Sequence, residues 1–102
     1  MGFQSQFKEL NIEMNKREEF MLKPGEKLLS INFLSNDQKI SYYSIPCKNT
    51  DVFVKLEEIL KQDFPWLKNK KYYFLNKTNI IETSKTIEEN NIHSNDIIQI
   101  HY

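Results

Sequence analysis

The stretch KTIEENNIHSNDIIQIHY, residues 85–102, decides the fold class of this chain. Its end alternates between apolar and polar side chains, a pattern that predicts a half-buried strand with Ile98 and Ile100 facing inward. Before the strand, Thr86 stands three positions ahead of Glu89, which is the spacing of a capping box and predicts a small capped turn. A capped turn that leads into such a strand needs a sheet, formed by earlier residues, on which to dock.

Two further strands are predicted upstream, in residues 27–35 and 40–46. Both carry apolar residues at every second position, which is the period of a strand. The short polar run between them predicts that they form a β-hairpin. We expect the second strand to stop at Pro46, because proline has no N–H group for a strand ladder. The expected inward positions are Leu29, Ile31, Phe33 and Ile45.

A helix is predicted after the hairpin, with Thr50 or Asp51 as its cap and an end near Asp63, before Pro65. Its apolar residues recur at helical spacing, while charged residues between them face water. A third strand is expected in residues 71–75, followed by a turn and a short apolar contact at the next isoleucines. The expected inward positions in these segments are Phe53, Leu56, Leu60, Ile87 and Ile92, with contact from Ile80–Ile81.

The order of these segments predicts an α+β fold, in which one helix is laid across a mixed sheet of four to five strands. The first and last strands can pair in parallel at the centre of the sheet, because the helix lies in the connection between them. This is the β-grasp arrangement, and we expect residues 25–102 to form it.

Residues 1–24 are predicted to form an N-terminal amphipathic helix and linker, which ends at Pro24 and Gly25. Two interpretations stay open: the helix packs on its own domain, or it forms the seam of a coiled-coil dimer. Arg17 interrupts the seam, and the segment is short for a coiled coil. The apolar stripe consists of Phe3, Phe7, Leu10 and Met14.

The composition argues against several classes of function. The chain has 14 basic and 14 acidic residues, so its net charge of zero provides no global attraction to nucleic acid or anionic lipid. Cys47 is the one cysteine, which excludes an internal disulfide and favours an intracellular location, in the cytoplasm or nucleus. No apolar run approaches the ~20 residues of a membrane span. No metal is expected, since one cysteine cannot form a Cys-rich metal cluster, and no other cofactor is expected, since the chain lacks a glycine-rich phosphate loop.

The second half of the chain resembles ubiquitin. In YYFLNKTNIIETSKTIEENNIHSNDIIQIHY, residues 85–87 and 91–92 match the basic-Thr-Leu step and the Asn-Ile pair of that family. The chain is also similar to ubiquitin-like domains at the C-terminal end of larger protozoan proteins. The resemblance spans residues 28–102 and is most specific over the last thirty. It implies a ubiquitin-like β-grasp fold that binds a protein partner.

Conjugation to other proteins requires a C-terminal Gly-Gly in this family, and here no glycine follows Gly25. The expected function is therefore a non-conjugated ubiquitin-like module for protein–protein interaction.

The resemblance also implies that partners dock on the outer face of the sheet. Alternation along the last strand turns Gln99 and His101 outward if the isoleucines beside them face in. Exposed aromatic residues beside polar groups are typical of binding hot spots. We therefore expect Phe74 to join Gln99 and His101 at the centre of this surface, with Tyr72 or Tyr73 at its margin. The rival occupant of the same face is the N-terminal stripe.

An enzyme is not expected. Cys47 lies in no pattern of His with Asn or Asp that would activate its thiol, and His93 and His101 lack the spacing of a metal site. Two alternatives to the interaction module remain. The first is an assembly subunit that oligomerises through its N-terminal helix. The second is a weak nucleic-acid binder that uses the lysines of residues 68–71 and the flanking tyrosines 72 and 73.

Overall fold

The structure is a computed structural model that describes residues 22–102. The predicted N-terminal helix, with its stripe of Phe3, Phe7, Leu10 and Met14, lies outside the described residues, and so does the self-association predicted from it.

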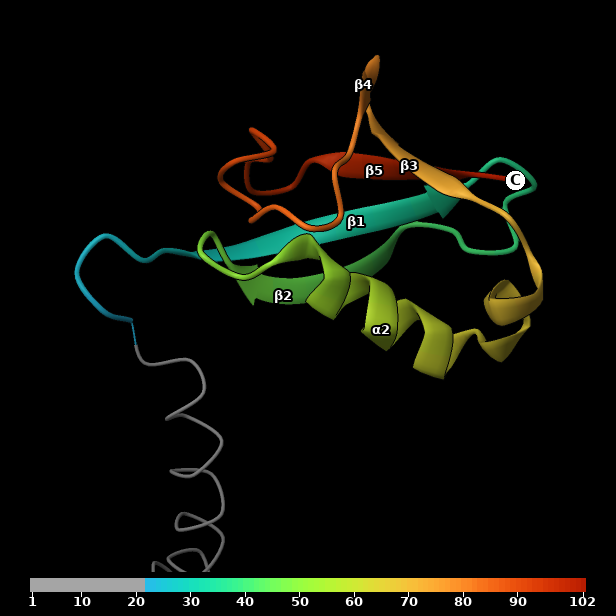
Figure 1. Ribbon diagram of the computed structural model, residues 1–102, viewed down its shortest axis with the longest axis horizontal. Coiled ribbons are helices and arrows are strands. Elements are labelled where there is room, and N and C mark those ends of the chain that lie inside the picture. The colour runs from blue at the N-terminus through green and yellow to red at the C-terminus, as the bar shows by residue number, and fades with distance from the viewer. Residues whose placement is uncertain (1–21) are drawn as a thin grey trace, which may run out of the picture.

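The described residues form a compact α+β domain with a five-stranded mixed sheet in the order β2-β1-β5-β3-β4 (Figure 1). The central strands β1 and β5 are parallel, and the other neighbours are antiparallel. This order is compatible with a β-grasp-like fold. The elements are β1 (Leu28–Ser35), β2 (Tyr43–Lys48), α2 (Phe53–Asp63), the 3-10 helix η1 (Pro65–Asn69), β3 (Tyr73–Asn76), β4 (Asn79–Ile80) and β5 (Ile97–His101).

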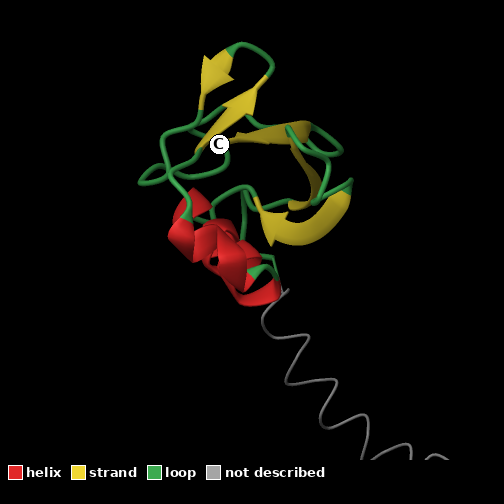
Figure 2. Ribbon diagram, turned by 90° about the vertical axis from the view of Figure 1, so that its right-hand side faces the viewer, coloured by secondary structure: helices red, strands yellow, loops and turns green. Residues whose placement is uncertain are grey.

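The core lies between one face of the sheet and α2, as the side view shows (Figure 2). Phe33 on β1 pairs in register with Ile98 on β5, and both are fully buried because strand alternation turns them toward the helix. The Phe53 ring from α2 meets Phe33 at 6.1 Å and Phe74 of β3 at 5.0 Å between ring centroids. These contacts join the helix to both halves of the sheet. No helix among residues 22–102 is long and apolar enough to cross a membrane.

Most of the predicted core positions are confirmed. Leu29 is half-buried at the edge of the core rather than inside it. The structure adds four buried apolar residues that the patterns did not indicate: Ile40, Cys47, Leu67 and Phe74. Ile81 is buried as the apolar contact after β4, whereas its neighbour Ile80 is exposed. The confirmed positions are Ile31, Phe33, Ile45, Phe53, Leu56, Leu60, Ile87, Ile92, Ile98 and Ile100.

The prediction that the second strand stops at Pro46 is wrong, because β2 continues through it to Lys48. Pro46 pairs with Ser30 at an edge of the sheet. On an edge strand, alternate residues turn their backbone groups away from the sheet, so a proline at such a position removes no ladder hydrogen bond. The proline therefore marks an edge strand rather than the end of one.

The prediction that Thr50 or Asp51 caps α2 is also wrong. The N-cap is Val52, and it makes no side-chain hydrogen bond. The loop before the final turn takes over this role: the N–H groups of Phe53 and Val54 donate to the carbonyls of residues 85 and 83, at 2.9 and 3.0 Å. Because these carbonyls satisfy the first orphan donors of the helix, no capping side chain is needed.

The capping box at Thr86 and Glu89 is confirmed. The Glu89 N–H donates to the Thr86 hydroxyl at 3.0 Å, and the Thr86 N–H donates to the Glu89 carboxylate at 2.9 Å. Thr86 also forms an isolated bridge with Val52. The box thus holds the loop whose carbonyls cap α2, and it places Ile87 in the core.

Candidate interaction surface

The face of the sheet opposite α2 presents the alternate residues of the three central strands. The pairing of β5 with both neighbours aligns Gln99 with Leu34 on one side and with Leu75 on the other. No helix of the described residues covers this face. We call this surface the outer face and define it by Leu34, Tyr73, Leu75, Ile97, Gln99 and His101.

The predicted residues Gln99, His101 and Tyr73 do lie on the outer face. Gln99 is exposed and His101 is half-buried. The His101 ring stacks on the Tyr73 ring, with 5.4 Å between centroids and 17° between planes. His101 Nε2 also lies 3.0 Å from Gln99 Oε1. The three side chains therefore hold one another in place, as a preformed binding surface requires.

The placement of Phe74 on the outer face is wrong. Phe74 is 2% exposed and packs edge-on against Phe33 and Phe53 in the core. The reason is the strand register: β3 pairs Phe74 with Ile100, whose side chain faces the helix. Alternation then turns Tyr73 outward, so Tyr73 replaces Phe74 on the surface.

Tyr72 lies on the helix side of the sheet, not at the margin of the outer face. Its hydroxyl donates to the Glu57 carboxylate on α2 at 2.5 Å. Its ring meets Phe74 at 5.3 Å. Burial and the bond to Glu57 raise the pKa of Tyr72 well above its usual range. Tyr72 thus ties β3 to the helix and is not available to an outer-face partner.

Sequence reasoning missed the apolar members of the outer face. Leu34 and Leu75 flank Gln99 and are half-buried, and Ile97 is 41% exposed. The alternation that identified Gln99 also indicates Ile97 on β5 and, read on β1, Leu34, whereas Leu75 is identified by its pairing with Gln99. None of the six outer-face residues is Asp, Glu, Lys or Arg. A surface of aromatic, aliphatic and amide groups without formal charge is typical of the core of a protein interface.

Two hollows flank the ridge formed by Leu34 and Gln99. Three residues on the rim of one hollow have left-handed backbone conformations: Tyr42 at φ 49°, Lys77 at φ 58° and Asn95 at φ 69°. A bulky residue such as Tyr42 rarely adopts this region, and such strain concentrates at binding sites. Tyr42 is also 61% exposed. Three loops therefore converge on one edge of the outer face.

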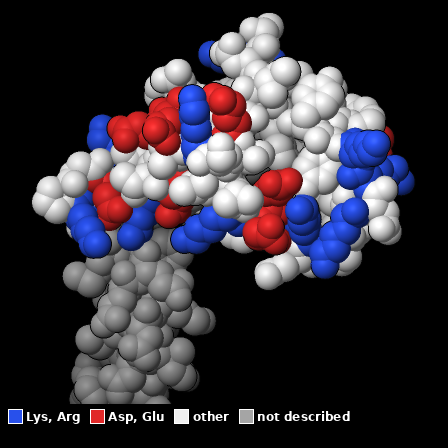
Figure 3. Space-filling view, viewed as in Figure 1, with Lys and Arg blue, Asp and Glu red and all other residues white. Residues whose placement is uncertain are grey.

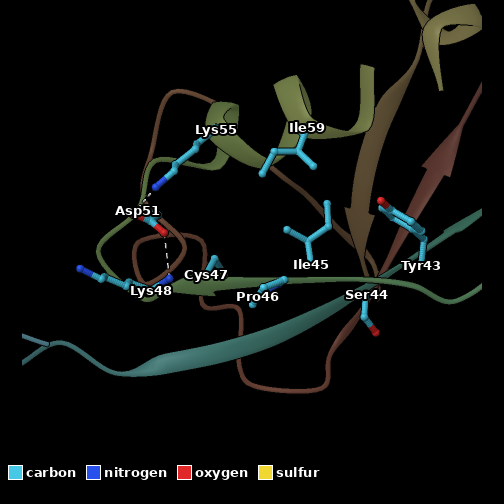
Figure 4. Close-up of a pocket in the computed structure, with 9 residues that line it drawn as sticks. All are labelled: Tyr43, Ser44, Ile45, Pro46, Cys47, Lys48, Asp51, Lys55 and Ile59. Atoms are coloured by element: carbon cyan, nitrogen blue, oxygen red, sulfur yellow. Dashed lines mark hydrogen bonds and ion pairs between the residues drawn. The ribbon is translucent and has the colours of Figure 1, made fainter. Parts of the chain in front are cut away.

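A groove of about 260 Å³ lies away from the outer face, between β2 and α2 (Figure 4). Asp51 closes one end of it, since Lys55 lies 3.5 Å from one carboxylate oxygen and the Lys48 N–H donates to the other at 2.8 Å. The Lys48 carbonyl accepts the Asp51 N–H at 3.0 Å. Both backbone groups of Lys48 are thereby engaged, and Pro46 has no N–H. An added strand would find few partners at this edge, so the groove is a weaker candidate than the outer face.

The thiol of Cys47 also lines this groove and is 3% exposed. Burial, with a smaller contribution from Asp51, raises the pKa of Cys47 to about 11. At neutral pH the sulfur is therefore protonated and a poor nucleophile. Among residues 22–102, no three His, Cys, Asp or Glu side chains come together in a way that could hold a metal ion.

Comparison of the chain with models of known protein families gives no match. Comparison with curated protein sequences gives no match either. The outer face is therefore assigned from its geometry and composition.

Proposed function

We propose that this domain is a ubiquitin-like protein-interaction module that binds its partner non-covalently through the outer face. The observation that carries the proposal is the uncharged row of Leu34, Gln99 and Leu75, which spans three paired strands. Burying such a row removes apolar area from water without the cost of desolvating a charge. The ubiquitin-like assignment is supported by the resemblance over residues 28–102 and by the parallel central strands with one helix on one face.

The outer face is suited to a protein more than to a small ligand. Its residues stand on hydrogen-bonded strands, which gives a rigid and broad platform. The Tyr73 and His101 rings are already stacked, so little side-chain entropy is lost when a partner covers them. Tyr42 and Ile80, 61% and 68% exposed, extend the apolar area beyond the central strands. A partner with an apolar surface of its own would match this composition.

The nucleic-acid alternative is disfavoured by the positions of the two tyrosines. Tyr72 faces the helix and is bonded to Glu57, whereas Tyr73 lies on the opposite face. The lysine run therefore lacks the pair of neighbouring free rings that base stacking would use. The assembly alternative rests on residues outside the described part of the chain and stays a prediction.

A comparison of captured proteins tests the proposal. The full chain is immobilised as wild type, as Gln99→Arg and as Val54→Arg, and each form is incubated with lysate from cells of the source organism. Gln99 is exposed at the centre of the outer face, and Val54 is 41% exposed on α2, so both variants add one positive charge to a surface position.

We expect proteins that bind the wild type and the Val54→Arg form but not the Gln99→Arg form. Circular dichroism of each variant establishes that the fold is retained. Equal capture by the wild type and the Gln99→Arg form would refute the outer face as the binding surface.

A further inference from the structure

Lysine side chains gather at the end of the molecule where α2 is followed by η1 (Figure 3). A hollow of about 400 Å³ lies there, lined by four lysines and one glutamate. We call the four lysines the lysine corner. The hollow is lined by Glu57, Lys61, Leu67, Lys68, Lys70, Lys71 and Tyr72.

The backbone that carries three of the four lysines is held in place by η1. Pro65 begins η1, and Leu67 within it is fully buried and anchors the short helix to the core. The Lys70 N–H donates to the Leu67 carbonyl at 3.0 Å, which ends the helix at this point. With Leu67 pointing inward, Lys68, Lys70 and Lys71 are all exposed. The lysines therefore project from a segment whose backbone is held in one conformation.

Positive charge in the hollow is largely uncompensated. Among residues 22–102, no carboxylate lies within ion-pair distance of Lys68, Lys70 or Lys71. The Glu57 carboxylate lies 3.9 Å from Lys61, and it also accepts the Tyr72 hydroxyl at 2.5 Å. Glu57 is thus the one carboxylate among the residues that line the hollow, and it is already engaged by Lys61 and Tyr72.

One lysine of the corner is also positioned by an aromatic ring. Lys70 Nζ lies 4.8 Å from the centroid of the Tyr102 ring. The Tyr102 hydroxyl donates in turn to Asp37 at 2.5 Å, and the ring meets Trp66 edge-on at 5.8 Å. A cation–π contact of this kind restrains a flexible side chain. The corner therefore keeps part of its charge in a fixed place.

We propose that the lysine corner binds a short acidic segment of a protein partner, at a site separate from the outer face. Charge complementarity argues for an anionic ligand, because several exposed ammonium groups converge on one hollow and attract carboxylates. The lysines are confined to one hollow, and the chain as a whole has no net charge that would attract a long polyanion. Both facts argue for a short acidic segment.

Base recognition is disfavoured by the rings at this corner. The Tyr72 ring packs on Phe74, the Tyr102 ring lies under Lys70, and Lys39 Nζ lies 5.7 Å from the centroid of Trp66. Stacked bases would need one of these ring faces to be free. A peptide carboxylate needs only the ammonium groups.

Fluorescence anisotropy with the full chain tests the proposal. The probe is a fluorescein-labelled peptide of alternating Glu and Ser residues, titrated at about 50 mM salt and again at about 150 mM, because exposed ion pairs are screened over this range. The corner variant is Lys68→Glu with Lys71→Glu. The control variant is Lys23→Glu with Lys27→Glu, which changes the net charge equally at two exposed lysines outside the corner and outside the outer face.

We expect binding that weakens at the higher salt concentration. The corner variant should bind about tenfold more weakly, from the loss of two exposed ion pairs, while the control changes by less than about twofold. No binding at the lower salt concentration would overturn the proposal, as would equal weakening by both variants, which would indicate a net-charge effect alone. Tighter binding of a single-stranded oligonucleotide that is lost in the corner variant would also overturn it, in favour of nucleic acid.

Discussion

Phe74 and Tyr73 are neighbours in the chain, but their replacement by alanine is predicted to lower stability by very different amounts. Phe74 is 2% exposed, and its ring meets Phe33, Phe53 and Tyr72 at 6.2, 5.0 and 5.3 Å between centroids. Replacing a buried phenylalanine by alanine costs about 3–5 kcal/mol, through lost burial and the cavity left behind. The edge-on ring contacts place Phe74→Ala toward the upper end of that range, since each is worth about 0.5–1.5 kcal/mol.

Tyr73→Ala is the matched control. Tyr73 is 49% exposed, and its main contact is the stacked ring of His101 on the neighbouring strand. A cross-strand pair of this kind contributes about 0.2–1 kcal/mol. The free energy of unfolding should therefore fall by less than about 1 kcal/mol in this variant, although we expect the outer face to lose affinity for its partner.

Urea unfolding of the full chain, followed by circular dichroism, measures both effects. For a urea slope of about 1–1.5 kcal/mol per molar, Phe74→Ala should lower the midpoint by about 3–5 M, and Tyr73→Ala by less than about 1 M. If Phe74→Ala does not fold, Phe74→Leu keeps the test informative, because it removes less volume and should still destabilise more than Tyr73→Ala. Equal midpoints for the wild type and Phe74→Ala, or a larger loss for Tyr73→Ala, would refute the register of β3.

Three other predictions follow from local contacts. Thr86→Ala should lower the free energy of unfolding by about 1 kcal/mol. Adding Glu89→Ala should lower it little further, because the two side chains form one capping box. Thermal or urea unfolding of the single and double variants measures both effects. The hydrogen bond from the Tyr102 hydroxyl is the main cause that lowers the pKa of Asp37 to about 2. Because this folded-state pKa lies below the ordinary value of 3.8, ionised Asp37 stabilises the folded chain above about pH 3.8, and this stabilisation is lost as the pH falls toward about 2. The melting temperature of Asp37→Asn should therefore fall less steeply than that of the wild type over this pH range. Cys47 should react slowly with iodoacetamide at about pH 8 in the native chain and rapidly in urea, because the thiolate is the reactive form and burial raises the pKa of Cys47 to about 11. Mass spectrometry measures the extent of labelling, and rapid labelling of the native chain would contradict the burial of Cys47.

The parts of the fold that were predictable are those with one strong period. The alternation of Ile98 and Ile100 and the capping box before them were read correctly, because each pattern permits one arrangement of the backbone. The parallel pairing of the first and last strands also followed, since the helix lies in their connection. By contrast, the cap of α2 comes from backbone carbonyls of a distant loop, a contact that no local pattern encodes.

The candidate site was predictable only on the strand with clear alternation. Gln99 and His101 were placed correctly, whereas the run of three aromatic residues at 72–74 gives alternation nothing to distinguish. Its register is decided by pairing with β5 and by the bond from Tyr72 to Glu57. The prediction at Pro46 failed for a related reason: whether a proline ends a strand depends on whether that strand lies at an edge of the sheet, which the local sequence does not show.

Chemical-shift mapping tests the central claim most directly. The ¹⁵N-labelled full chain is titrated with a protein recovered by the wild type and lost by Gln99→Arg. We predict that the largest amide shifts cluster at Leu34, Tyr73, Leu75 and Gln99, with smaller changes around Tyr42. Shifts confined to the β2–α2 groove or to Pro65–Asn69, with the outer-face amides unmoved, would contradict the account.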